Sequence, residues 1–182
     1  MNINTQEQWR AWRDAAKRDA IDLSLRSFYT DLDTAVAERG AVCNASGRCC
    51  KFESYGHRLY VTGLEIAWFM QAVVSRQSGV GTDTSTSQSR FSLQQFSSTP
   101  NPQTLTPNCP YQIDGLCSTH TIRPLGCRVY FCEEGTEDWQ QDTTELFLAR
   151  LKTLHTEHDL PYVYMEWRAG LAEAGRVMDA SI

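Results

Sequence analysis

The sequence has no long hydrophobic run and no excess of basic residues. None of its segments approaches the roughly 20 apolar residues that a membrane-spanning helix needs. The net charge of −5 and the pI of about 5.3 have the wrong sign for holding phosphate backbones. Residues 1–7 also lack the charged-then-apolar order of a signal peptide. We therefore expect a cytoplasmic protein that binds neither membranes nor nucleic acid.

Common catalytic signatures are missing as well. The chain has no Ser-His-Asp order, glycine-rich phosphate loop or dinucleotide-binding fingerprint. His155 and His158 lack a carboxylate pattern that would complete a metal or catalytic motif, and we expect both on the surface. The sequence therefore names no catalytic residue and does not decide whether the protein is an enzyme.

Cysteine is the abundant feature, with seven residues in a chain of 182. In a reducing compartment, cysteines are more often metal ligands or redox groups than parts of a disulfide framework. The odd count points the same way. A cysteine on its own is equally often a small buried hydrophobe, but these residues are grouped in two segments. The grouping favours metal ligation.

The spacing of apolar residues predicts several helices. The clearest is residues 19–39, where Ile21, Leu25 and Phe28 fall on one face and Gly40 supplies a C-terminal stop. A second helix should begin near Leu64, after a capping box formed by residues 62–65. Further helices are expected at about 142–158 and 166–177, and short strands at 58–61 and 162–165. Trp9 and Trp12 are expected in the core.

We predict a small α+β fold, mostly helical, in which cysteine-bearing loops and a few short strands form a single domain around a metal site. Residues 1–42 form an N-terminal helical region, residues 43–132 a metal-chelating domain, and residues 133–182 a C-terminal helical region packed on the same domain. The stretch at about 75–108 is rich in Ser, Thr and Gln. We interpret it as an insertion that metal binding does not need.

The cysteines suggest a site that joins both segments. Soft thiolates select zinc, iron–sulfur clusters or monovalent copper, and four of them complete a tetrahedral zinc site or a cubane cluster. Adjacent Cys49 and Cys50 would point to opposite sides of an extended chain, so both can reach one metal only if the backbone turns there. The expected ligands are Cys43, Cys49 or Cys50, Cys109, Cys117 and Cys127, with Cys132 as an alternate.

A four-thiolate site carries a charge of about −2 with Zn²⁺ or an oxidised cubane, so cations beside it are stabilising. Arg123 and Arg128 lie close to Cys127 in the sequence, and we expect both next to the ligands. His120 is a further candidate, either beside the ligands or as a ligand itself.

Residues 43–132 resemble the YkgJ-like cysteine-cluster family. Cys43, Cys49 and Cys50 match its CxxCxxCC signature, with Ser46, a poor ligand for soft metals, at the second cysteine position. Residues 109–128 match the family's second block. The resemblance implies a zinc- or iron-chelating domain. A related cluster in flagellin lysine N-methylase, which the block also resembles, suggests that some members assist protein modification.

The leading hypothesis is therefore a metal-chelating protein that binds zinc or an iron–sulfur cluster through clustered thiolates. One alternative is an iron–sulfur enzyme or accessory factor that modifies a protein or small molecule. A further alternative is a protein-interaction module in which the metal is only a scaffold and the partner is another protein. The sequence leaves the choice of metal open.

Overall fold

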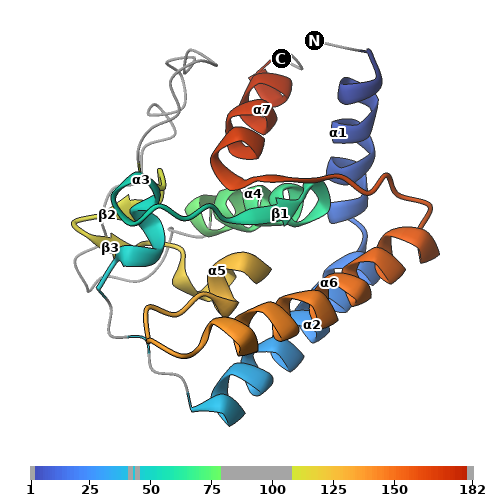
Figure 1. Ribbon diagram of the computed structural model, residues 1–182. Coiled ribbons are helices and arrows are strands. Elements are labelled where there is room, and N and C mark those ends of the chain that lie inside the picture. Colours follow the sequence, from blue (N-terminus) through green and yellow to red (C-terminus); the bar gives the residue numbers. More distant parts are fainter. Residues whose placement is uncertain (1–2, 41–42, 44–45, 79–107, 180–182) are drawn as a thin grey trace.

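Helices make up most of the fold, and short antiparallel strands complete it (Figure 1). The computed structural model describes residues 3–40, 43, 46–78 and 108–179. The helices are α1 (Ile3–Ala16), α2 (Asp19–Arg39), α3 (Phe52–Tyr55), α4 (Gly63–Ser78), α5 (Leu125–Val129), α6 (Glu137–Glu157) and α7 (Trp167–Asp179). The strands are β1 (Tyr60–Thr62), β2 (Gln112–Ile113), β3 (Leu116–Cys117) and β4 (Tyr164–Glu166). This small, mostly helical α+β domain agrees with the predicted fold class.

The helix α2 has the bounds that the hydrophobic pattern predicts. Ile21, Leu25 and Leu32 are fully buried, as expected of one helix face. Gly40 adopts a left-handed conformation (φ 73°) and donates its backbone N–H to the Ala37 carbonyl, which ends the helix. The prediction for this segment is confirmed.

The predicted capping box is also present, at the start of α4. Thr62 Oγ1 accepts the backbone N–H of Glu65 at 3.2 Å, and the Glu65 carboxylate accepts the backbone N–H of Thr62 at 2.9 Å. The other Glu65 oxygen accepts the Tyr29 hydroxyl at 3.0 Å and the backbone N–H of Leu125 at 2.9 Å. One fully buried carboxylate thus joins α2, α4 and α5.

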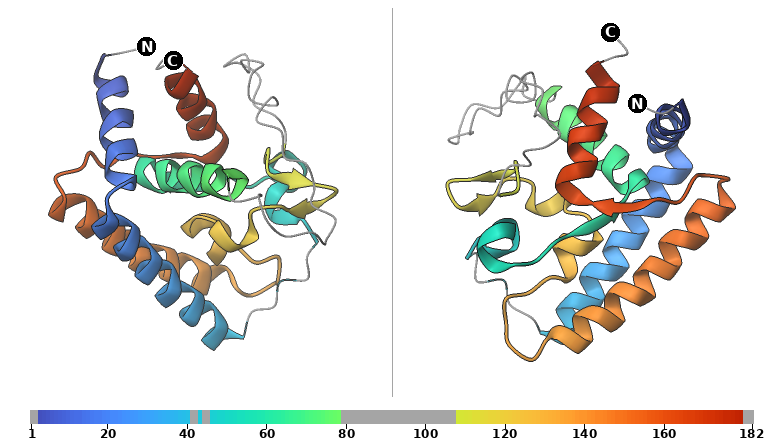
Figure 2. Two further views of the ribbon diagram at one scale, coloured as in Figure 1. Left: turned by 180° about the vertical axis from the view of Figure 1, so that it is seen from behind. Right: turned by 45° about the horizontal axis from the view of Figure 1, so that its top comes forward.

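Two short strands connect the middle of the chain to its C-terminal part. β1 and β4 pair antiparallel with Val61 opposite Met165, and α7 follows β4 directly (Figure 2). Both strands lie one or two residues further along the chain than predicted. This pairing brings α7 against α4 and towards the cysteine segments.

The core lies where α1, α4 and α7 meet, and continues between α2, α5 and α6. Trp9 and Trp12 are buried, as predicted. A Cβ on Gly63 would stand 2.4 Å from the Trp12 ring, so glycine permits α1 to approach α4 closely. The Trp12 indole N–H donates to the Pro161 carbonyl at 2.7 Å, which satisfies its polar end.

Two expectations about α6 are wrong in detail. The helix begins at Glu137, earlier than predicted, because Glu137 and Asp138 in its first turn suit the positive end of the helix dipole. His155 is buried, although we expected it on the surface. Its Nδ1 lies 2.8 Å from the Pro161 carbonyl, and burial lowers its pKa. The residue is part of the core.

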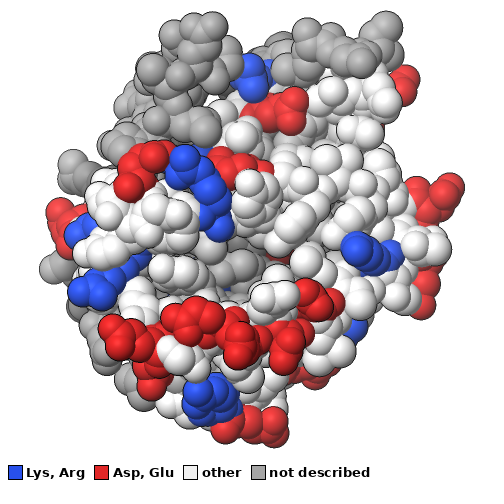
Figure 3. Space-filling view, in the orientation of Figure 1, with Lys and Arg blue, Asp and Glu red and all other residues white. Residues whose placement is uncertain are grey.

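Most of the predicted insertion lies outside the described residues, since residues 79–107 are not described. Its first residues, 75–78, belong to α4. In the described part of the chain, no helix combines the length and the apolar character needed to cross a membrane. Acidic side chains gather along the lower part of the molecule, over α6, in agreement with the negative net charge (Figure 3).

Candidate metal centre

The first cysteine segment makes the turn that a shared site requires. Gly47 is left-handed (φ 68°) and leads into a 3-10 turn over Arg48–Cys50. In this turn the sulfurs of Cys49 and Cys50 lie 3.9 Å apart. An extended chain would have separated them. The thiols of Cys49 and Cys50 can therefore both reach one metal ion.

The second segment meets the first through a backbone hydrogen bond, from the N–H of Cys109 to the carbonyl of Cys50 at 2.8 Å. Cys109 precedes a hairpin in which β2 pairs with β3. Asp114 and Gly115 both have positive φ, 49° and 80°, as a two-residue hairpin turn requires. The hairpin returns the chain so that Cys117, at the end of β3, faces the same region as Cys109.

Five cysteines surround a cavity of about 20 Å³, which is the size of roughly one water molecule. Cys127 joins them from α5, and Arg123 and Trp167 complete the wall. The five are Cys49, Cys50, Cys109, Cys117 and Cys127. The fold thus brings together both cysteine segments.

Four of these thiols share hydrogen bonds, with Cys50 at the centre. Cys50 interacts with Cys109, Cys117 and Cys49, and these bonds raise its pKa, so it is the thiol that keeps its proton. The same bonds are the main cause of the lowered pKa of the other three, to about 6 for Cys117 and about 7 for Cys49. Burial raises the pKa of Cys127 well above its usual range. Cys49, Cys109 and Cys117 therefore lose their protons more readily than Cys50 and Cys127.

Further hydrogen bonds to sulfur come from nearby N–H and O–H groups. The Trp167 indole N–H donates to Cys109 Sγ at 3.4 Å, and the backbone N–H of Tyr111 donates to the same sulfur. Thr119 interacts with Cys117 through its backbone N–H and through its hydroxyl, which lies 3.7 Å from the sulfur. Such bonds stabilise a thiolate whether it is free or bound to a metal.

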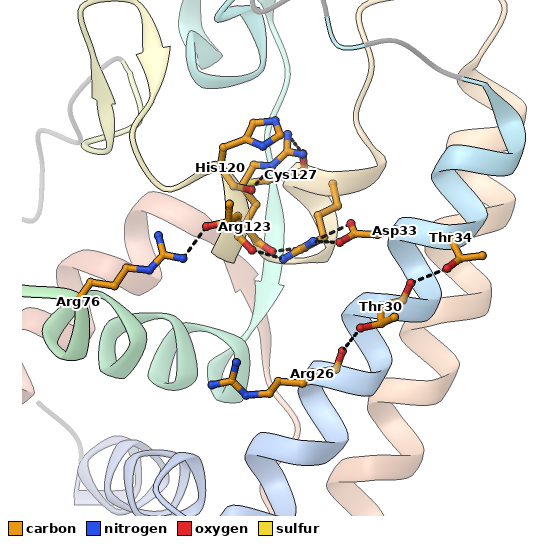
Figure 4. A network of polar contacts seen from close by, with 10 residues as sticks. Arg26, Thr30, Asp33, Thr34, Arg76, His120, Arg123 and Cys127 are labelled. Atoms are coloured by element: carbon orange, nitrogen blue, oxygen red, sulfur yellow. Dashed lines mark hydrogen bonds and ion pairs between the residues drawn. The ribbon is translucent and has the colours of Figure 1, made fainter. Parts of the chain in front are cut away.

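The two predicted arginines have different surroundings. Arg123 lines the cavity and helps to lower the pKa of Cys49 and Cys117, after the hydrogen bonds to Cys50. Its guanidinium donates to the carbonyls of His120 and Cys127, at 3.0 and 3.2 Å (Figure 4). The positive charge of Arg123 therefore faces the thiols, and it also holds the ends of the segment that carries Cys127.

Arg128 is 5% exposed and bonds to oxygen atoms. It contacts both carboxylate oxygens of Asp33 on α2 at 2.6 Å and the Thr121 carbonyl at 2.9 Å. Its guanidinium also lies over the Tyr29 ring. These contacts fix α5 against α2. His120 lies beside Arg123 in Figure 4, and burial lowers its pKa.

Cys43 and Cys132 line a different cavity, of about 220 Å³, next to the first. Both are exposed. Ser46 Oγ lies 3.8 Å from Cys132 Sγ, and Cys49 and Arg123 border both cavities. The structure therefore divides the seven predicted ligands into an inner group of five and an outer pair.

As they stand, the described residues contain no group of three or more His, Cys, Asp or Glu side chains set to hold a metal ion. The inner thiols converge through shared hydrogen bonds instead, so metal binding would require them to turn their sulfurs towards a common centre. Rotation about one side-chain bond is the smallest change that does this.

Two contributors to the site did not emerge from the sequence. Trp167 is one of them, and its contact with Cys109 depends on strand pairing that no local pattern reveals. The hairpin that carries Cys117 has a local signal, the Asp114-Gly115 pair, which is typical of two-residue turns.

No family model, curated protein or solved structure matches this chain. The resemblance to the YkgJ-like family therefore stays a prediction that depends on the cysteine motifs and their order.

Proposed function

We propose that the protein binds a single thiophilic metal ion, best fitted by zinc, through Cys49, Cys50, Cys109 and Cys117. The ion would tie the two cysteine segments together, and its role is structural. Four thiolates fill all positions of a tetrahedral zinc, whereas a catalytic zinc keeps one position open. Cys127 is the neighbouring fifth thiol, and Cys43 and Cys132 lie outside the proposed site.

The observation that carries this proposal is the spacing of the Cys49 and Cys50 sulfurs, 3.9 Å. Two sulfurs bound to one zinc lie about 3.8 Å apart, given a Zn–S bond of about 2.3 Å and tetrahedral angles. Sulfurs on one cubane lie roughly 6 to 7 Å apart. The cavity of about 20 Å³ also suits one ion better than a cluster of iron and sulfide.

The charged and polar groups around the cavity also support a zinc site with four thiolates. A zinc ion with four thiolates carries about −2, and Arg123 is the cation beside it. The N–H groups of Trp167, Tyr111 and Thr119 already point at two of the sulfurs. Hydrogen bonds from outside the ligand shell orient metal-bound groups and delocalise their charge.

Metal content tests the proposal directly. Protein purified without oxygen should contain about one zinc per chain by elemental analysis and should be colourless, because zinc has no visible absorption and iron–thiolate clusters are brown. Cys117→Ser should lose the zinc, since a hydroxyl is a poor ligand for a soft site.

Cys132→Ser is the matched control, because it makes the same chemical change in the outer pair, and it should keep its zinc. Brown protein with several irons per chain would show that the site holds an iron–sulfur cluster and not zinc. Equal zinc loss in both variants would show that the outer pair belongs to the site, contrary to our assignment. If both variants keep their zinc, Cys117 is not one of the ligands.

A further inference from the structure

A third cavity is lined by no cysteine, and most of its wall is apolar. It is formed where α1, α4 and α7 come together, at the end of the molecule where α1 and α7 run side by side (Figures 1 and 2). Its volume is about 300 Å³, at the lower end of the range for small-molecule sites. Ala67, Met70, Val74, Ala174 and Val177 give it an apolar wall.

The charged residues at this cavity are cationic, and two uncharged polar residues, Gln71 and Ser75, also line it. Arg13 and Lys17 of α1 line it, and none of the described residues that line it is acidic. This is unusual for a chain with a net charge of −5. Lys17 contacts Asp14 at 3.8 Å, but both side chains are 62% exposed, so the pair is weak. The cavity therefore offers positive charge beside an apolar wall.

Two buried N–H groups at the cavity have no partner in the described part of the chain. They are the indole Nε1 of Trp9, which is 4% exposed, and the Nε of Arg13. A buried indole N–H usually finds an acceptor, and leaving one without a partner is costly. Both groups are donors, so the missing partner is a hydrogen-bond acceptor.

We propose that this cavity binds a small amphipathic carboxylate, such as a medium-chain fatty acid. Small turns of the Trp9 and Arg13 side chains, whose unpartnered N–H groups are buried, would let the carboxylate accept hydrogen bonds from both, and the hydrocarbon tail would lie against the apolar wall. At roughly 30 Å³ per heavy atom, a cavity of this size holds about ten heavy atoms, which is most of a ten-carbon fatty acid. The site is separate from the proposed metal centre and does not depend on it.

Titration with decanoate below its micelle concentration, followed by calorimetry, tests this site. We expect saturable binding of one ligand per chain. Hexanoate and octanoate should bind progressively more weakly, by up to about tenfold for two CH₂ groups, and dodecanoate should gain little because the cavity is full. Decanol should bind at least fivefold more weakly than decanoate, because it lacks the charge that Arg13 pairs with.

Two variants locate the ligand. Arg13→Gln should weaken decanoate binding about fivefold, while Arg10→Gln, the same change at an exposed position of α1 that does not line the cavity, should not. Val74→Trp should reduce binding at least tenfold by filling the space. Val74 is 39% exposed, so the larger side chain leaves the core intact, which circular dichroism and an unchanged melting temperature would verify.

The proposal is overturned if decanoate does not bind, if decanol binds as tightly as decanoate, or if Arg10→Gln weakens binding as much as Arg13→Gln. The last result would indicate a general attraction of anions to α1.

Discussion

At the scale of single residues, Trp167 connects the core to the cysteines. Its ring packs against Phe69 and Tyr111, which makes it a core residue by any packing criterion. Its indole N–H, however, is directed at the Cys109 sulfur at 3.4 Å. An N–H donor on a thiolate lowers the energy of the charged form. We infer that this residue supports the proposed metal site in addition to filling the core.

Trp167→Phe should therefore weaken zinc binding by about tenfold or more, the usual effect of removing a hydrogen bond to a metal ligand. Competition with a chelator of known affinity measures this. Phenylalanine keeps an aromatic ring in the core but has no N–H, so the variant should still fold.

Trp68→Phe provides the comparison. It also removes an indole hydrogen bond, from Trp68 to Asp22 at 2.8 Å, but it does so away from the cysteine cavity. Its zinc affinity should stay within about twofold of the original, since only hydrogen bonds made to the metal ligands themselves affect the metal. Equal weakening in both variants would mean that loosened core packing, and not the bond to Cys109, controls the affinity.

At the scale of elements, the two turns that precede Cys49 and Cys117 approach each other closely. A Cβ on Gly47 would lie 2.1 Å from the Gly115 carbonyl oxygen and 2.6 Å from the Gln112 side-chain nitrogen. Gln112 in turn donates to the carbonyls of Gly47 and Gly115, at 2.9 and 3.1 Å. The Gln112 side chain thus holds the first cysteine turn and the hairpin in contact by bonding to a backbone carbonyl of each.

Gly47→Ala should destabilise the protein by about 3 kcal/mol, because it combines a left-handed backbone with a clash against a carbonyl group. Urea denaturation measures the change. Gly56→Ala is the control, since Gly56 has a similar φ of 67° but nothing within 4 Å of its Cβ position. It should cost only about 1 kcal/mol. Similar losses in both variants would show that the two turns do not pack as described.

The helices differ in how far their bounds could be predicted from the sequence. The bounds of α2 were predictable because its apolar residues repeat with the helix period and Gly40 ends it. The helix α5 was not predicted, because a five-residue helix has no measurable period, and its start depends on the distant Glu65 carboxylate. α1 lies within the N-terminal helical region predicted for residues 1–42, but its bounds were not predicted, although the burial of its tryptophans was.

For the candidate site, the sequence identified the residues but not their grouping. Cys49, Cys50, Cys109, Cys117 and Cys127 converge, whereas Cys43 lines the outer cavity with Cys132. Local spacing could not separate the two groups, because the division depends on contacts between segments, such as the backbone bond from Cys109 to Cys50.

At the scale of the whole molecule, the cysteine cavity is the meeting point of four parts of the chain. The first cysteine turn and the segment of the hairpin supply the proposed ligands, the segment of α5 supplies Cys127 and Arg123, and α7 supplies Trp167. Arg168, the next residue of α7, pairs with Glu53 of α3 at 3.1 Å and is 4% exposed. A metal at the centre would therefore bind only when these parts are assembled, so its binding free energy would contribute to folding.

Removal of zinc should lower the melting temperature. If free zinc exceeds its dissociation constant about a thousandfold, binding stabilises the folded state by about 4 kcal/mol. For a chain of this length that corresponds to a loss of about 8 to 16 °C on addition of excess chelator. The double variant Cys43→Ser, Cys132→Ser should show the same loss, because it leaves the four proposed ligands in place. Cys117→Ser should melt at the lower temperature from the start and should not respond to chelator. If its melting temperature still falls on chelation, the stabilising metal is bound elsewhere, and the inner thiols only form a hydrogen-bonded core.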